Sequence, residues 1–501
     1  MKRSILAIAL AATFVPALSS AAVPVVFTNL WTTNHGATGL NTGVTSEISA
    51  FDSSTNTLWV AGVVGVDVLN ASTGALVQHI AASGINSVAI KNGVAAFAVE
   101  NSTRNLPGTV QFYDTASRTL TGSVAVGALP DMLTFTPDGS KLLVANEATP
   151  NAVADAAYTL PDPAGTVSII DMNTRTVAAT AGFVGVTQTG SNLRTNTGMD
   201  FEPEYIAVNA AGTKAFVGLQ EANGMGVLDL STNTFTSVIG LGVKDFSQNN
   251  NWIDPSDEDP KAAPITSLRS VNVKGLYQPD GMATYQAKDV NNVVQTFIVM
   301  ANEGDTREDE ADKARVKDVA AIVGEPDELK RLNISTTDST ALNNLVTFGA
   351  RSFSIRDEDG NIVYDSGNIL DAEAIAHGIY DDKRSDDKGV EPEGVTLLEL
   401  GGRTLAFVGL ERTTTSAVAI FDITDPANSQ YLDMIVGTGD KSPEGLLAYS
   451  YGGVNYLAVA HEVSNTTSLY SISAAVPEPE TYAMMLAGLG LVGFLARRRK
   501  G

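Results

Sequence analysis

Two stretches of the chain repeat one order of residue types, and both end in an acid. EPEGVTLLELGGRTLAFVGLE covers residues 391–411, and SPEGLLAYSYGGVNYLAVAHE covers residues 442–462. Each contains an acid in a turn, an apolar run, a Gly-Gly turn and a second apolar run that ends in Glu. Because carboxylate oxygens are preferred ligands of calcium, this pattern could support the binding of a hard divalent cation.

The acidic turn and the terminal Glu also recur earlier in the chain. One acid of each pair precedes an inner strand, and the other follows the next strand. Since alternate loops of antiparallel strands leave a sheet on the same side, we expect both acids on one face, at a common channel mouth. The predicted acids are Asp131 and Glu147, Glu204 and Glu221, Asp280 and Glu303, Glu393 and Glu411, Glu444 and Glu462, with Glu100 unpaired.

So many carboxylates around one opening would repel one another without compensation. A bound cation, nearby Arg, raised pKa values or backbone N–H groups could supply it, and some of the acids could simply cap turns. Arg307 and Arg412 are candidate counter-charges or contacts for an anionic substrate. The candidate neutral ligands or supporting donors, each directly before a Glu, are Asn146, Gln220, Asn302 and His461.

Short strands must position these acids. The chain has 45 Gly and many β-branched residues, without heptads or long amphipathic helices. Units of three or four strands, repeated about every 40 to 50 residues, predict an all-β, seven-bladed β-propeller over residues 23–474. A pair of β-sandwiches or a β-helix is the alternative. The last unit has three strands, and we expect AVPVVFTNLW, residues 22–31, to complete it and close the ring.

Long insertions are predicted to rise from the acidic face, which makes that face the functional one. They cover residues 148–165, 184–201, 243–278, 304–345 and 369–389. The insertion at 304–345 should include short helices and could cover the channel. DPSDED (254–259) and DDKRSDDKG (381–389) resemble loose calcium loops, but neither completes an EF-hand. Solvated acidic loops are the favoured interpretation of both.

Composition restricts the classes of partner. A net charge of −24 argues against binding to nucleic acid or anionic membranes and suits divalent cations or basic partners. The chain has no Cys, which excludes disulfides and thiolate metal sites. With only four His, a His-rich zinc site is improbable, whereas carboxylates are abundant.

Both chain ends have the composition of targeting segments. Residues 1–22 combine Lys2 and Arg3, an apolar run and small residues, which predicts a Sec signal peptide. Near the other end, Val-Pro-Glu-Pro precedes an apolar run at about residues 482–496 and a basic cluster. The run predicts a short transmembrane helix, and the basic cluster predicts that its end stays in the cytoplasm.

The C-terminal order, over residues 475–501, resembles the PEP-CTERM sorting signal of Gram-negative bacteria that make an exopolysaccharide-rich matrix. The resemblance implies anchoring in the inner membrane, processing by an exosortase-type enzyme, and delivery to the cell surface or the medium.

The PDG…NEGDTRE segment (279–308), with EPEG and SPEG after it, resembles the choice-of-anchor I family. That domain is similar to mesenchyme-specific cell-surface glycoproteins. Some relatives carry alkaline phosphatase labels. The expected propeller fold is also similar to that of calcium-dependent phosphatases in which glutamates at the channel mouth bind metal ions. The resemblance implies functional roles at Asp280, Asn302, Glu303, Asp305, Arg307, Glu393, Glu411, Glu444 and Glu462.

Two functions follow as hypotheses. The favoured one is a surface or matrix propeller that binds a divalent cation, calcium, and recognises an exopolysaccharide or surface protein through its loops. The alternative is a metal-dependent phosphoesterase that uses the same carboxylates. No G-x-S-x-G nucleophile turn and no phosphate-binding loop occurs, so the sequence identifies no catalytic residue. A glycosidase-type pair of carboxylates is a weaker option.

Overall fold

The computed structural model describes residues 24–38, 46–149, 163–195, 201–258, 267–306 and 312–475. The chain divides into one large unit, residues 27–473, and a second unit formed by its two ends. The predicted signal peptide, the predicted transmembrane segment at 482–496 and Arg307 lie outside the described residues. Within the described residues, no helix combines the length and the hydropathy that crossing a membrane requires.

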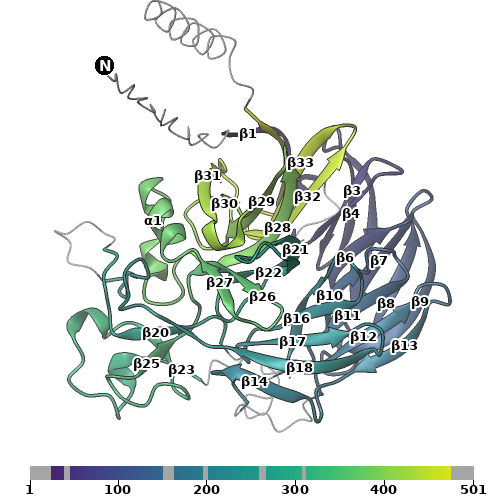
Figure 1. Ribbon diagram of the computed structural model, residues 1–501. Coiled ribbons are helices and arrows are strands. Elements are labelled where there is room, and N and C mark those ends of the chain that lie inside the picture. Colours follow the sequence, from purple (N-terminus) through teal and green to yellow (C-terminus); the bar gives the residue numbers. More distant parts are fainter. Residues whose placement is uncertain are drawn as a thin grey trace, which may run out of the picture. The chain divides into compact units, whose positions relative to one another are not determined.

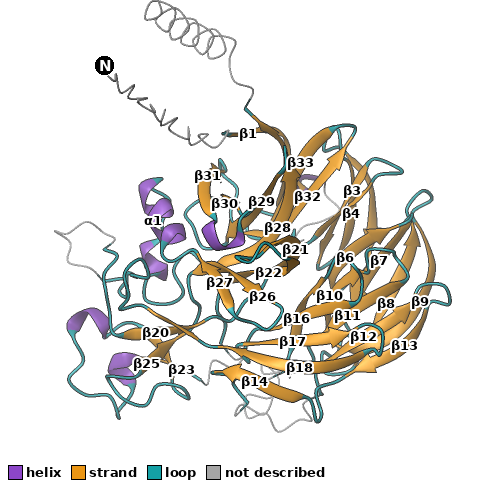
Figure 2. Cartoon of the chain, viewed as in Figure 1, coloured by secondary structure: helices purple, strands orange, loops and turns teal. Residues whose placement is uncertain are grey.

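The fold is all-β (Figures 1 and 2). Seven sheets of four or five strands follow one another along the chain. The strands of the first three sheets are β2 (Ser49–Asp52), β3 (Thr57–Gly62), β4 (Gly65–Asn70) and β5 (Leu76–Ala81); β6 (Ile85–Lys91), β7 (Val94–Val99), β8 (Pro107–Asp114) and β9 (Thr119–Ala128); β10 (Pro130–Phe135), β11 (Lys141–Asn146), β12 (Thr166–Asp171) and β13 (Thr176–Ala181).

The remaining four sheets have the same meander, with three differences: an added strand β14, an insertion after β22, and a last sheet completed by β1. Their strands are β15 (Pro203–Val208), β16 (Lys214–Leu219), β17 (Gly224–Asp229), β18 (Thr234–Leu241) and β14 (Thr187–Ser191); β21 (Met282–Lys288), β22 (Val294–Asn302), β26 (Ser352–Asp357) and β27 (Ile362–Asp365); β28 (Pro392–Leu400), β29 (Arg403–Leu410), β30 (Ala417–Asp422) and β31 (Gln430–Val436); β32 (Pro443–Tyr451), β33 (Val454–His461), β34 (Thr466–Ala474) and β1 (Val25–Asn34).

The first strands of consecutive sheets contact one another. The order of contact runs from β2 through β6, β10, β15, β21 and β28 to β32, and β2 also contacts β32, which closes a ring. These seven first strands line a central cavity of about 760 Å³. The arrangement is consistent with a β-propeller, in which radial repetition leaves only short sheet edges.

The hydrophobic core lies between neighbouring sheets. One cluster joins the first two sheets around Trp59 and Phe97, and another joins the fifth and sixth sheets around Phe353 and Phe421. Second strands are covered on both faces, and all six residues of β3 are buried. This burial explains why second strands are continuous apolar runs in the sequence.

Asp residues at the ends of third strands form the turns into fourth strands. The Asp229 carboxylate accepts hydrogen bonds from the backbone N–H groups of Ser231 at 2.7 Å and Thr232 at 3.1 Å. Asn233 follows with a φ of 56°, a left-handed conformation that Asn tolerates better than most residues. The strands β8, β12, β17, β26 and β30 all end in Asp, and this recurring Asp is therefore a turn residue.

Strand β1 completes the last sheet, in the order β1–β34–β33–β32, which confirms the predicted closure. His35 begins a short 3-10 helix, η1 (His35–Thr38), directly after β1. Its Nδ1 lies 2.8 Å from Asp67 of the first sheet, and its Nε2 lies 2.8 Å from the Thr467 hydroxyl of the last sheet. His35 therefore joins the first sheet to the last.

Replacing His35 with Ala should lower the free energy of unfolding by about 3 kcal/mol, because it removes a fully buried side chain and two buried hydrogen bonds. Urea unfolding measures this loss. The control is His377→Ala at an exposed position, which should leave the midpoint unchanged. Equal midpoints for both variants would contradict the role of His35 in closure.

Residues of two insertions, 243–278 and 304–345, form a second, smaller core that includes Phe246, Val273, Val316 and Leu332. The elements of these insertions are β19 (Val243–Asp245), β20 (Val273–Leu276), β23 (Lys313–Arg315), β24 (Asn333–Ser335), β25 (Leu345–Thr347) and the 3-10 helices η2 (Val316–Asp318) and η3 (Asp327–Leu329). The insertion at 369–389 contains α1 (Ile369–Ala376) and η4 (Asp382–Arg384), and Leu370 and Ala374 of α1 pack in the core of the fifth and sixth sheets. The helix η5 (Pro426–Asn428) lies between β30 and β31. The insertion at 184–201 differs from the prediction, because its residues 187–191 form β14, parallel to β18.

Candidate functional site

Carboxylates from all seven sheets and their insertions lie close to one another at the mouth of the central cavity, and six of them line it: Glu47, Glu100, Asp131, Glu147, Asp280 and Glu444. We call this set the acidic rim. Its members are Glu47, Glu100, Asp131, Glu147, Glu202, Glu204, Glu221, Asp280, Glu303, Asp305, Glu391, Glu393, Glu411, Glu444 and Glu462. It contains every acid that the sequence places at the channel mouth.

A repeated backbone turn brings the two acids of a sheet together. In the third, sixth and seventh sheets, the residue before the Pro has a positive φ: 43° at Leu129, 50° at Glu391 and 54° at Ser442. The carbonyl of that residue accepts the N–H of the Glu after the second strand, at 2.9 Å in each sheet. Because the two segments are hydrogen-bonded, the acid after the Pro and the terminal Glu lie side by side.

A β-bulge lies at the acid of the same turn. The register of the first and second strands shifts between Pro130 and Leu133, and again between Pro392 and Val395 and between Pro443 and Leu446. A bulge inserts an extra residue and changes the direction of a side chain. The Pro–acid pair in the sequence therefore marks the position at which the first strand directs a carboxylate to the rim.

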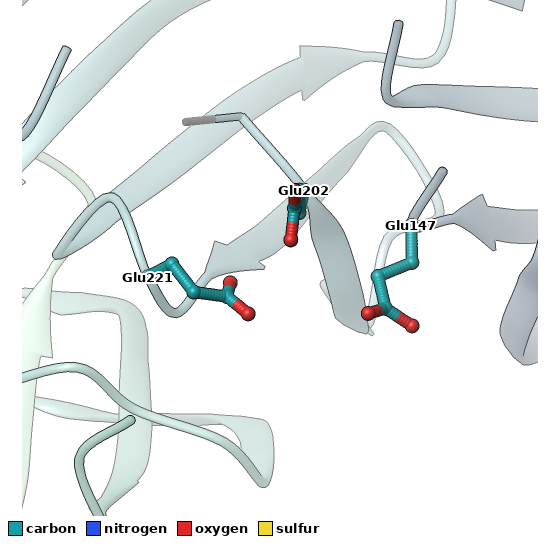
Figure 3. Close-up of side chains that lie close together, drawn as sticks. All are labelled: Glu147, Glu202 and Glu221. Carbon is teal, nitrogen blue, oxygen red and sulfur yellow. The ribbon is translucent and has the colours of Figure 1, made fainter. Parts of the chain in front are cut away.

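In the part of the chain that the structure describes, four sets of three carboxylates have ligand atoms within 4.8 Å of one another. The sets are Glu147, Glu202 and Glu221; Asp280, Glu303 and Glu393; Glu303, Glu391 and Glu411; and Glu411, Glu444 and Glu462. Figure 3 shows the first, in which the Glu202 side chain lies between the other two. Thr149 donates hydrogen bonds to Glu147 and Glu202 in this set.

Cationic side chains compensate part of the rim. Lys388 Nζ lies 2.6 Å from Glu303 Oε1 and 3.1 Å from Glu391 Oε2. Arg384 donates to Glu391 at 2.8 Å through Nε, and Arg412 lies 2.9 Å from Glu411 Oε1. The set of Glu303, Glu391 and Glu411 is therefore held by three cations of the chain.

Two rim acids outside this set have a buried oxygen without a hydrogen-bond partner among the described residues. Glu393 is 8% exposed, and its Oε2 has no hydrogen-bond partner among the described residues. The Oε2 of Glu221 is buried in the same way. Since a buried polar atom without a partner costs free energy, both oxygens are candidates to bind a group that the chain does not supply.

The pKa values show that the ionised forms of these closely spaced carboxylates are unfavourable in the folded protein. Burial and the neighbouring acids raise the pKa of Glu221 and of Glu411 to about 8. Burial, and then the charge of Glu303, raises the pKa of Asp280 to about 7. Burial, and then the charge of Glu303, raises the pKa of Glu393 well above the usual range, and burial, and then the charge of Glu411, does the same for Glu444. A protein without a cation at the rim therefore keeps part of these groups protonated near neutral pH.

Three of the predicted neutral ligands do not belong to the rim. Asn146 Oδ1 accepts from the Gly127 N–H at 3.0 Å and its amide donates to Thr166, Asn302 bonds Ser354, and His461 bonds Ser416. Neighbouring side chains of a strand point to opposite sides, so a residue directly before a rim acid is directed away from the rim. Gln220 differs, because its amide donates to Glu303 at 2.8 Å.

The two acid-rich loops are partly buried, whereas the favoured interpretation is that both are solvated. Asp254 and Asp386 are buried. Asp254 pairs with Arg269 at 3.1 Å, and Asp386 pairs with Arg315 at 2.6 Å. Asp254 and Arg269 lie in one insertion, whereas Asp386 and Arg315 belong to two different insertions, so the Asp386 pair connects them.

Three acids of the rim, and Lys388 beside it, were not predicted from the sequence. Glu202 and Glu391 are the first acids of two Glu-Pro-Glu turns, of which only the second acids were predicted. Glu47 precedes the first strand of the first sheet as Glu444 precedes that of the last, so the alignment of repeats could have identified it. Lys388 has no such signal, because it belongs to a mixed-charge loop.

Comparison with known proteins adds family and fold. Residues 47–426 match the family model of the Choice-of-anchor I domain, and residues 475–500 match the PEP-CTERM protein-sorting motif. No curated protein matches the chain. The hydrazine synthase of Kuenenia stuttgartiensis is a similar solved structure, with a TM-score of 0.50 and 11% identity over 86% of this chain and 96% of that one. At this identity the similarity concerns the fold alone.

Proposed function

The chain belongs to the Choice-of-anchor I family and ends in a PEP-CTERM sorting motif, and from this premise we propose that it is an exported surface protein that binds calcium at the acidic rim. We further infer that the seven sheets are seven propeller blades. The contact of β2 with β32 supports the count, because it joins the first sheet to the last.

The observation that carries the cation site is the Glu393 carboxylate. It is buried, one of its oxygens has no partner among the described residues, and it lies with Asp280 and Glu303 in one set. Calcium binds oxygens at about 2.4 Å, so two ligands on opposite sides of one ion are about 4.8 Å apart. The spacing of the carboxylates in each set is compatible with a shared ion.

Sorting follows from the C-terminal motif, which implies export and processing by an exosortase-type enzyme. We propose that residues 482–496 anchor the protein in the inner membrane before it reaches the surface. At the surface, the insertions beside the rim would contact an exopolysaccharide or a surface protein.

A metal-dependent phosphoesterase is the second candidate, and one observation favours it. Arg412 contacts the rim at Glu411, yet its side chain is 41% exposed. A guanidinium in this position could contact a phosphate oxygen of a substrate whose other oxygens bind the metal.

Calcium should raise the melting temperature of protein purified without added metal, because a ligand that binds only the folded state stabilises it. At 100 times the dissociation constant, the expected gain is about 2.7 kcal/mol. Metal analysis of the same sample and p-nitrophenyl phosphate hydrolysis complete the test. Stabilisation without turnover supports the binding role, and calcium-dependent turnover supports the phosphoesterase. A sample without bound metal that calcium does not stabilise would contradict both.

A further inference from the structure

We infer that Lys388 is a tethered cation that occupies one position of the acidic rim, between Glu303 and Glu391, and thereby limits the number of metal ions that the rim binds. The inference rests on the proposed calcium site and specifies which part of the rim is open to calcium.

The contacts of Lys388 are those of a bound cation. Its Nζ lies 2.6 Å from Glu303 Oε1, 2.6 Å from the Gly304 carbonyl oxygen and 3.1 Å from Glu391 Oε2. Three oxygens from two segments of the chain thus surround one ammonium group, which has three N–H donors.

The loop that carries Lys388 is held in place. Arg351, which is buried, donates from Nη2 to the carbonyl oxygens of Ser385 at 2.8 Å and Asp387 at 2.9 Å. Gly389 has a φ of 70°, and a Cβ there would lie 3.1 Å from Arg351 and Asp371. The backbone on both sides of Lys388 is therefore fixed by packing, and the ammonium group has a defined position.

Lys388 divides the rim into parts of different charge. Its own set, Glu303, Glu391 and Glu411, also contacts Arg384 and Arg412. The unpartnered oxygens of Glu221 and Glu393 belong to other sets. A divalent cation between Glu303 and Glu391 would have to displace Lys388. The set of Asp280, Glu303 and Glu393 shares Glu303 with Lys388, and the remaining two sets contain neither of its carboxylate partners. The lysine thus selects which carboxylates accept metal.

The test is the calcium stoichiometry of the full chain, measured by equilibrium dialysis with calcium alone. Lys388→Met should bind one more calcium ion per chain than the wild type, because the replacement is long and uncharged. Lys388→Arg keeps the charge and should bind the wild-type number. If the wild type binds calcium and Lys388→Met binds the same number of calcium ions per chain, this inference is overturned and the proposed function stays intact. A wild type that binds none overturns the proposed function.

A second measurement on the wild type covers the case in which Lys388→Met does not fold. Acetylation by acetic anhydride, followed by mass spectrometry, reports whether each lysine is accessible. Lys388 should resist modification with and without saturating calcium, whereas Lys441, which is exposed, should react in both conditions. Calcium that makes Lys388 reactive would show that the metal displaces it and would overturn the inference.

Discussion

Replacing Glu393 and Glu444 together with Gln should weaken calcium binding by at least about 100-fold, since two charged ligands are lost and about 1.4 kcal/mol is a factor of ten. Both residues follow the Pro of the repeated turn, in β28 and β32, and belong to two of the carboxylate sets. Gln keeps the size of the side chain, so the change acts mainly through charge.

The same variant should be more stable than the wild type in the absence of metal. Burial and neighbouring acids raise the pKa values of both groups well above normal, which means that their ionised forms are unfavourable in the folded state. Gln removes that cost. The expected signature is therefore a higher melting temperature in chelator and a reduced gain on addition of calcium.

Glu399→Gln is the matched control, because Glu399 is an exposed residue of the same strand, β28. It should have the wild-type melting temperature in chelator and the full response to calcium. If the double variant behaves as Glu399→Gln does, the rim does not bind calcium through Glu393 and Glu444.

The metal-free protein should lose stability as the pH rises from 5 to 8. The pKa values of Glu221 and Glu411 are about 8 in the folded state against a usual value of 4.5, and those of Asp280 and Glu303 are about 7. Between the unfolded and folded pKa values, the folded state retains protons that the unfolded chain has released. The free energy of unfolding therefore falls with rising pH.

The size of the effect follows from the same shifts. One pKa unit corresponds to about 1.4 kcal/mol, so a single group that keeps its proton across these three pH units gives a decrease of about 4 kcal/mol, and the coupled groups together should give at least that. Urea unfolding at several pH values in chelator measures it. Carboxylates with lowered pKa values, such as Asp138 at about 2, titrate below this range and do not contribute to it.

Saturating calcium should oppose this decrease, because the metal binds the ionised carboxylates and competes with protons. The Glu393→Gln, Glu444→Gln variant in chelator should also depend less on pH, since two of the groups no longer titrate. A wild type whose unfolding midpoint in chelator stays constant or rises between pH 5 and pH 8 would contradict the electrostatic description of the rim.

The sequence by itself determined the short strands, their turns and the position of the acids beside those turns. Strand period, Gly turns and the spacing of repeats predict short strands in a ring, and strand β1 completes the last sheet as expected. The Pro–acid turns predict acids on one face because a turn and the end of the next strand are hydrogen-bonded neighbours within one sheet. These relations involve residues close in the sequence or in equivalent repeats, so the pattern of residue types reveals them. The signal peptide and the transmembrane segment stay predictions.

Only the tertiary structure decided which charges compensate one another. Lys388 reaches Glu303 from 85 residues away, and Arg331 reaches Asp257 from 74 residues away. No local pattern specifies such pairs, because they depend on how segments from different insertions and sheets meet in the folded chain. Strand alternation directs Asn146, Asn302 and His461 away from the rim, which the prediction of neutral ligands did not take into account. Which carboxylates remain open to a cation is therefore a property of the assembled ring.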